Sequence, residues 1–247
     1  MATTTISVER LAKVYRPAPR LGDLLRGRLG GRPVTALEDV SLEARSGEVV
    51  AILGENGAGK STLLKCLAGL VAPTRGRVEV AGHDAGAGGA ALRRDVRYVA
   101  GEARSFAWGL SGRANLEFFA ALFGHRRDEA RRRAGELLGR VGLDEAAAAR
   151  RVGEYSSGMR QRLALARGFL GEPRVFLFDE PTSGLDPRAA RAHRRLLASL
   201  AEEGRTVLIA THLVDEAREL SHRTIVLGAG RVLSAGPFGP EVEAAFA

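Results

Sequence analysis

A glycine-rich segment in the first quarter of the chain has the composition and spacing of a phosphate-binding loop. Residues 54–62 read Gly-Glu-Asn-Gly-Ala-Gly-Lys-Ser-Thr, which is a glycine, four residues and then Gly-Lys-Ser. The three glycines allow backbone conformations with positive φ, so that successive N–H groups can turn toward phosphate oxygens. Lys60 can reach the outer phosphates of a nucleotide, and the Ser61 hydroxyl can bind Mg²⁺. The predicted phosphate contacts are Gly54, Glu55, Asn56, Gly57, Ala58, Gly59, Lys60, Ser61 and Thr62.

Two adjacent carboxylates follow an apolar run in the second half of the chain. Residues 174–178 read Arg-Val-Phe-Leu-Phe, and Asp179 and Glu180 come directly after them. Ligands of a parallel sheet gather at the carboxyl ends of its strands, so a strand here would bring both acids to the phosphates. Asp179 is then placed to hold Mg²⁺, directly or through water. Glu180 could polarise a water molecule aimed at the terminal phosphate.

The segments around these residues predict the elements that position them. Val49–Leu53 is an apolar run of strand type, and residues 61–70 carry leucines on one face of a helix. Strand and helix patterns alternate along the chain, which predicts a parallel sheet covered by helices. A chain of 247 residues can bury a full α/β core as one domain, and no internal repeat is visible.

Further motifs make the sequence similar to the ATP-binding cassette (ABC) ATPases. Residues 155–162, Tyr-Ser-Ser-Gly-Met-Arg-Gln-Arg, precede an apolar helical stretch and resemble the signature motif of that family. Residues 183–186, Ser-Gly-Leu-Asp, follow the two acids at the distance of its D-loop. His212 ends the next predicted strand and matches the switch histidine, and Tyr15 matches the aromatic residue that stacks on adenine. The resemblance runs from about residue 6 to residue 235.

This resemblance implies ATP and Mg²⁺ as cofactors and a head-to-tail pair of ATPase domains. Each ATP would contact the phosphate loop of one subunit and the signature of the other. Hydrolysis would depend on Glu180 for the water, His212 for the γ-phosphate and Lys60 for the developing charge. The other implied site residues are Tyr15, Ser156, Ser157, Gly158 and Asp186 at the nucleotide, and Ser61, Asp179 and Glu102 at the metal.

The signature itself departs from the family pattern. It has Tyr155, Ser157 and Met159 where the family usually has Leu, Gly and Gln, but it retains Ser156 and Gly158. Because this segment opens a predicted helix, its hydroxyls and N–H groups can face a phosphate that arrives from outside.

Two other features depart from the pattern. Glu102 stands where the family usually carries a Gln that contacts Mg²⁺ or the attacking water, so it adds a negative charge near the phosphates. An arginine-rich insertion at residues 16–33 separates Tyr15 from the next strand and puts its stacking role in question.

The predicted fold class is α/β, a P-loop NTPase fold with a mixed or parallel sheet. We expect an inserted helical subdomain that carries the signature and a small antiparallel β part at the N-terminus. The RecA-like core would cover about residues 1–87 and 172–235, and the helical subdomain about 88–171.

Composition adds fewer constraints. The net charge is +8 and most basic residues are arginines. This charge fits attraction to anionic lipid head groups, binding of nucleic acid, or a coding bias toward arginine with no binding role. No stretch reaches the roughly 18 apolar residues of a membrane helix, and the N-terminus does not resemble a signal peptide. We therefore expect a cytoplasmic protein that is peripheral on the inner face of the membrane. The single cysteine, Cys66, is expected to be a small buried hydrophobe.

The resemblance implies an ATP-hydrolysing subunit that drives a separate polytopic membrane permease. An exporter is expected, because the residues after 235 leave no room for the extra β-domain of many importer ATPases. Residues 102–111 lie where the family receives the permease, so Phe106 and Trp108 are either contacts or local packing. Whether the subunit forms a homodimer or a heterodimer stays open.

The alternative is a non-transport ABC ATPase that acts on ribosomes or nucleic acid. A gap of about a hundred residues without sustained heptads separates the phosphate loop from the signature, which disfavours a chromosome-type ATPase. Nucleic acid is therefore not an expected partner.

Overall fold

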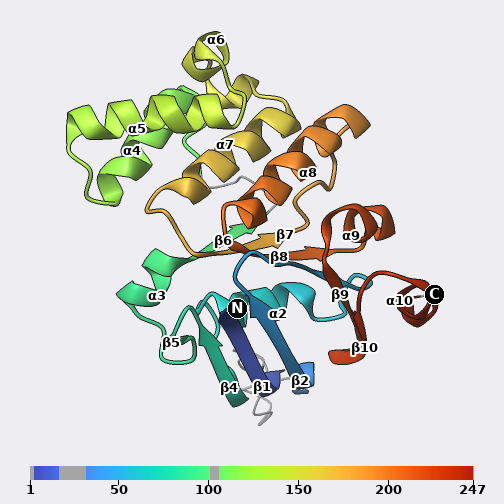
Figure 1. Ribbon diagram of the computed structural model, residues 1–247. Coiled ribbons are helices and arrows are strands. Elements are labelled where there is room, and N and C mark those ends of the chain that lie inside the picture. The colour runs from blue at the N-terminus through green and yellow to red at the C-terminus, as the bar shows by residue number, and fades with distance from the viewer. Residues whose placement is uncertain (1–2, 17–31, 101–105, 247) are drawn as a thin grey trace, which may run out of the picture.

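The computed structural model describes residues 3–16, 32–100 and 106–246 (Figure 1). Within these residues, six strands form a mixed sheet in the order β10-β9-β3-β8-β7-β6. Five of them are parallel neighbours, and β10 pairs antiparallel with β9 at one edge. The strands are β3 (Val49–Leu53), β6 (Val96–Ala100), β7 (Val175–Asp179), β8 (Thr206–Thr211), β9 (Arg223–Gly228) and β10 (Arg231–Gly236). The central strands β3, β7 and β8 are buried along their whole length, which explains their continuous apolar sequences.

A second sheet is antiparallel and comes mostly from the N-terminal part of the chain. Its order is β2-β1-β4-β5, with β1 (Thr4–Tyr15), β2 (Val34–Arg45), β4 (Arg75–Val80) and β5 (His83–Asp84). The pairing of β1 with β2 contains register shifts, and Arg10 and Asp39 adopt positive φ values of 46° and 55° beside them. These irregularities bend a long two-stranded ribbon over the core.

Helices separate and cover the two sheets. Helix α2 (Lys60–Leu67) lies between them, and its leucines share one buried cluster with β1, β2, β4 and one face of the central sheet. The opposite face of the central sheet packs against α7 (Ser157–Phe169) and α8 (Pro187–Glu202) and, beyond them, α4 (Gly112–Leu122) and α5 (Arg127–Arg140). The remaining elements are α3 (Ala90–Asp95), α6 (Glu145–Ala149), η1 (Val152–Glu154), α9 (Val214–Leu220) and α10 (Pro240–Phe246).

This architecture confirms the predicted fold class, with differences in detail. Helix α2 ends earlier than the sequence pattern suggests, because Gly69 takes the left-handed conformation (φ 65°) that stops a helix. Cys66 is fully buried on this helix as expected, and burial raises the pKa of its thiol to about 11. Among the described residues, no helix has the length and apolar character needed to cross a bilayer.

Candidate nucleotide-binding site

The glycine-rich loop joins the end of β3 to the start of α2. Gly57 and Gly59 adopt positive φ values of 88° and 106°, as the sequence predicts. Gly54 does not, which corrects the expectation that all three glycines serve by positive φ. A Cβ at Gly54 would lie 2.4 Å from the backbone oxygen of Leu227 on β9. Gly54 is therefore required for the close approach of two backbones.

A cavity of about 270 Å³ opens on one side of this loop. Its walls come from the start of β2, the loop itself, the first turn of α2 and Glu180. Its lining residues are Val34, Thr35, Ala36, Glu55, Asn56, Gly57, Gly59, Lys60, Ser61, Thr62 and Glu180. Most of the predicted phosphate contacts thus face one space, and the partial positive charge of the α2 N-terminus points into the same region.

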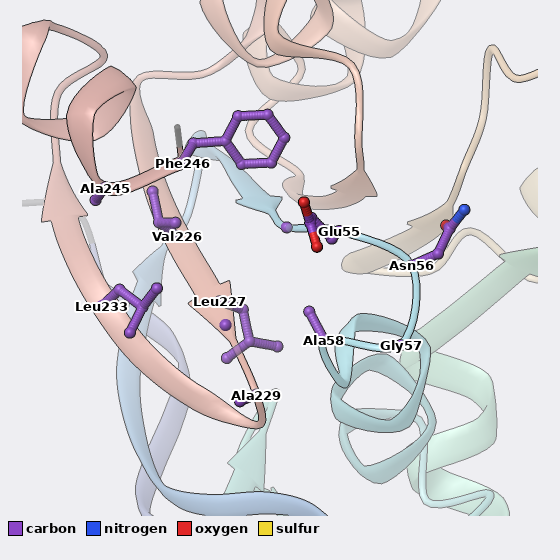
Figure 2. A pocket seen from close by; sticks show the side chains of 12 residues that line it. Glu55, Asn56, Gly57, Ala58, Val226, Leu227, Ala229, Leu233, Ala245 and Phe246 are labelled. Atoms are coloured by element: carbon purple, nitrogen blue, oxygen red, sulfur yellow. The ribbon is translucent and has the colours of Figure 1, made fainter.

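A second cavity, of about 370 Å³, lies on the other side of the loop. Figure 2 shows Glu55 and Ala58 beside Leu227 of β9, Leu233 of β10 and Phe246 of α10. Neither Lys60 nor Glu180 lines this second cavity. The residues with phosphate chemistry therefore belong to the first cavity.

Lys60 lies inside the loop and is only 6% exposed. Its ammonium donates to the backbone oxygens of Gly54 at 2.7 Å and Glu55 at 3.1 Å, and it forms an ion pair with Glu180 Oε1 at 3.4 Å. The ammonium can be buried here because Glu180 neutralises its charge and two backbone carbonyls accept its hydrogen bonds.

Glu180 and His212 are in direct contact. The second carboxylate oxygen of Glu180, Oε2, lies 2.7 Å from Nδ1 of His212. Glu180 has a positive φ of 53°, a conformation that costs a non-glycine residue energy. Its N–H donates to the oxygen of Ala210 at 2.8 Å, which fixes this turn against β8. The three residues predicted to support hydrolysis, Lys60, Glu180 and His212, are brought together.

Two of the predicted metal ligands also meet. The Ser61 hydroxyl donates to Asp179 Oδ1 at 3.0 Å, and Asp179 is 9% exposed at the end of β7. The third, Glu102, lies outside the described residues. Hydroxyl and carboxylate oxygens are hard donors of the kind that Mg²⁺ prefers, so the pair fits that ion.

Sequence reasoning missed one side chain that bonds to a site residue, Tyr98, and one buried acid, Glu216 of α9. The Tyr98 hydroxyl donates to Asp179 Oδ2 at 2.7 Å, and Thr182 donates to the buried Glu216 at 2.7 Å. Burial raises the pKa of both Tyr98 and Glu216 above their ordinary values. Tyr98 could have been found as a tyrosine near the end of a strand that neighbours β7. Glu216 gave no such signal, because an acid in the first turn of α9 reads as an ordinary helix start.

The signature residues lie apart from the first cavity. Ser156 caps α7 by accepting from the Met159 N–H at 3.2 Å, and Ser157 donates to the oxygen of Gly184 at 3.4 Å. Gly158 packs near Leu185 of the predicted D-loop. None of the three lines the cavity, so the chain brings the signature to its own D-loop and not to its own phosphate loop.

Asp186 and Tyr15 have local partners as well. The Asp186 carboxylate caps α8 by accepting from the N–H groups of Arg188 at 3.0 Å and Ala189 at 2.9 Å. Tyr15 is 39% exposed, pairs with the cavity residue Val34, and has the Lys13 ammonium 5.0 Å from its ring centre. The insertion that follows Tyr15 lies, from residue 17 to 31, outside the described residues.

The fold and the loop together define a P-loop nucleotide-binding protein. A family model described as ABC transporter matches residues 37–183, more than half of the chain. The protein therefore belongs to the ABC transporter family, as the sequence motifs indicate.

Individual relatives agree with this assignment. The chain is 41% identical over 212 residues to the doxorubicin resistance ATP-binding protein DrrA of Mycobacterium tuberculosis, which covers 86% of this chain and 63% of the relative. It is 40% identical over 212 residues to the methionine import ATP-binding protein MetN of Cereibacter sphaeroides, covering 84% of this chain and 60% of the relative. The chain thus spans less than two thirds of the length of these relatives.

A solved structure shares the fold. The dimeric, post-hydrolysis ATP-binding cassette MJ0796, bound to ADP and Pi, superposes with a TM-score of 0.80 at 29% identity, covering 95% of this chain and 99% of that one. The α/β core and the helical part therefore belong to the ABC cassette fold.

Proposed function

We propose that the protein binds and hydrolyses ATP as the motor subunit of an ABC transporter. The observation that carries this proposal is the meeting of Lys60, Glu180 and His212 beside the phosphate-loop cavity. An ammonium, a carboxylate and an imidazole at one point provide charge stabilisation, a proton acceptor and a hydrogen-bonding group, which phosphoryl transfer to water needs.

Each group has a separate task in this reaction. Glu180 accepts the proton of the attacking water, and its bond to His212 Nδ1 fixes the direction of the carboxylate. Lys60 exchanges its carbonyl partners for phosphate oxygens when the nucleotide enters. Ser61 and Asp179 would hold Mg²⁺, which would neutralise charge on the phosphates.

We infer that hydrolysis requires a second ATPase domain. The signature hydroxyls and N–H groups at the start of α7 do not line the cavity of their own chain, so a phosphate would reach them from a partner. The dimeric state of the related cassette MJ0796 supports this arrangement. The partner is either a second copy of this chain or a related ATPase.

The permease is expected to dock on the helical side of the molecule. Several large apolar side chains of the segment 108–123 are exposed, including Phe118 at 57% and Leu122 at 68%. Phe106, by contrast, is buried and packs edge-to-face on Phe119, so its role is local packing. Trp108 is 52% exposed and therefore stays a candidate for contact with the permease. Exposed apolar groups of this kind support a contact with another protein.

Export is the direction that we propose. The doxorubicin resistance relative supports it, and the methionine import relative is the competing precedent. A motor subunit bound to its permease would lie at the inner face of the membrane.

The test is capture of tagged Glu180→Gln from gently solubilised cells in ATP and Mg²⁺, followed by identification of the bound proteins. A polytopic membrane protein is the expected result, and its class would decide between export and import. Ribosomal proteins or nucleic acid without a membrane protein would overturn the transport proposal in favour of the non-transport alternative.

A further inference from the structure

The starting point is the place of Tyr98 on β6. Strands β6 and β7 pair in parallel, with Tyr98 opposite Leu177 and Ala100 opposite Asp179. Because side chains two residues apart on a strand point to the same face, Tyr98 and Asp179 are diagonal neighbours on one face of the sheet. The long tyrosine side chain spans this diagonal, and its hydroxyl lies 2.7 Å from Asp179 Oδ2.

The direction of this bond follows from the two groups. An ionised carboxylate can only accept, so the phenol must donate. A hydrogen bond to a charged acceptor is stronger and more directional than one between neutral groups.

The two oxygens of Asp179 have different kinds of partner. Oδ1 accepts from Ser61, which is itself a metal ligand under the proposed function. Oδ2 accepts from Tyr98, which is not. Tyr98 therefore fixes the rotation of the carboxylate by a contact that does not depend on whether the ion is present. Groups that orient a metal ligand in this way commonly change metal affinity by about 10- to 100-fold when they are removed.

We propose that Tyr98 is a positioning residue that holds Asp179 ready for Mg²⁺, an inference that rests on the proposed function. Tyr98 contacts neither nucleotide nor ion in this role and acts through Asp179. Loss of its hydroxyl weakens the Mg²⁺-dependent part of ATP binding and leaves the Mg²⁺-independent part unchanged.

The experiment measures binding of a fluorescent ATP analogue to Tyr98→Phe, first in EDTA and then against rising free Mg²⁺. We expect equal affinity in EDTA and a half-saturating Mg²⁺ concentration that rises by about tenfold or more. The phenyl ring keeps the packing of the half-buried side chain, and a thermal melt verifies the fold.

Ser46→Ala is the control. The Ser46 hydroxyl also donates one hydrogen bond of 2.7 Å, to the backbone oxygen of Gly204, and Ser46 lies in the turn between β2 and β3, outside the proposed site. Its removal costs the fold a similar hydrogen bond but leaves Asp179 untouched. The Mg²⁺ dependence of nucleotide binding is expected to stay at the wild-type value.

Asp179→Asn separates failure of this inference from failure of the proposed function. A shifted Mg²⁺ dependence in Asp179→Asn without a shift in Tyr98→Phe would overturn the positioning role. Wild-type Mg²⁺ dependence in Asp179→Asn would instead overturn the assignment of Asp179 to the metal. If Tyr98 acts through Asp179, the double variant shows no larger shift than Asp179→Asn alone.

Discussion

The two halves of the proposed ATP site are organised in opposite ways. On the phosphate-loop side, Lys60 and His212 each contact the carboxylate of Glu180, and Lys60 and Glu180 line a cavity. On the signature side, Ser156 caps its own helix and Asp186 caps α8. The first half has its charged groups assembled, whereas the second consists of two capped helix N-termini, which under the proposed function meet the phosphate of a partner. From this difference we expect that ATP binding and ATP hydrolysis can be separated by mutation.

The largest effect is expected on the assembled side, from Glu180→Gln. Loss of a general base typically costs about 10²- to 10⁴-fold in rate, while the amide can still bond to His212 and leave ATP binding intact. Phosphate release measures the rate, and light scattering with ATP and Mg²⁺ measures dimer accumulation. The control is Glu145→Gln, an exposed acid paired with Arg113. A Glu180→Gln protein that stays monomeric with ATP would contradict the two-domain site.

The next effect is loss of nucleotide affinity in Lys60→Ala. A charged hydrogen bond is worth about 1.5–3 kcal/mol, so affinity should fall by about 10- to 150-fold. Isothermal titration with ATP measures it. Lys65→Ala, in the last turn of the same helix, changes the same charge away from the cavity and should bind normally. Normal ATP binding by Lys60→Ala would contradict the assignment of residues 54–62 as the phosphate-binding loop.

On the signature side, Ser156→Ala tests a residue that caps α7 and is also expected to contact the ATP of a partner domain. Removal of an N-cap serine costs about 0.5–2 kcal/mol of stability, and here it should also abolish ATP-driven pairing while the monomer binds ATP normally. Ser111→Ala is closely matched, because Ser111 caps α4 by accepting from the Ala114 N–H at 3.1 Å. Denaturant unfolding and light scattering should show equal loss of stability in both variants, and loss of pairing in Ser156→Ala alone. Equal pairing in the two would refute the signature role.

The smallest effect concerns Glu216 of α9, which is 1% exposed. Burial raises the pKa of its carboxyl, so the folded state binds the proton more tightly than the unfolded state. The stability that it contributes is present below its ordinary pKa and is lost as pH rises through the raised value. Glu216→Gln should therefore gain thermal stability relative to the wild type as pH rises above the ordinary carboxyl pKa of about 4.3. The exposed neighbour Glu219→Gln is the control, and a pH-independent difference for Glu216→Gln would contradict the raised pKa.

The parts of the site that follow from strand ends and loop spacing could be predicted from the sequence. Asp179 and Glu180 follow a buried parallel strand that only β8 separates from the strand leading into the phosphate loop, so the topology brings them to the same edge of the sheet as Lys60. The Tyr98 contact could not be predicted, because it depends on the register of β6 against β7. The need for a glycine at position 54 could not be predicted either, because it depends on the close approach of Leu227 on β9, 173 residues later in the chain (227 − 54). Strand register and close packing between distant backbones are set by tertiary structure, so a local sequence pattern does not predict them.

The bonds that Lys60 makes to the carbonyls of Gly54 and Glu55 bear on how long a product stays in the site. A cation that already has partners gains only the difference between its old and new contacts when a phosphate replaces them. The same carbonyls are available again when the phosphate leaves, so the ammonium is never left bare during the exchange. Under the proposed function, we expect this exchange of partners to favour release of the spent nucleotide.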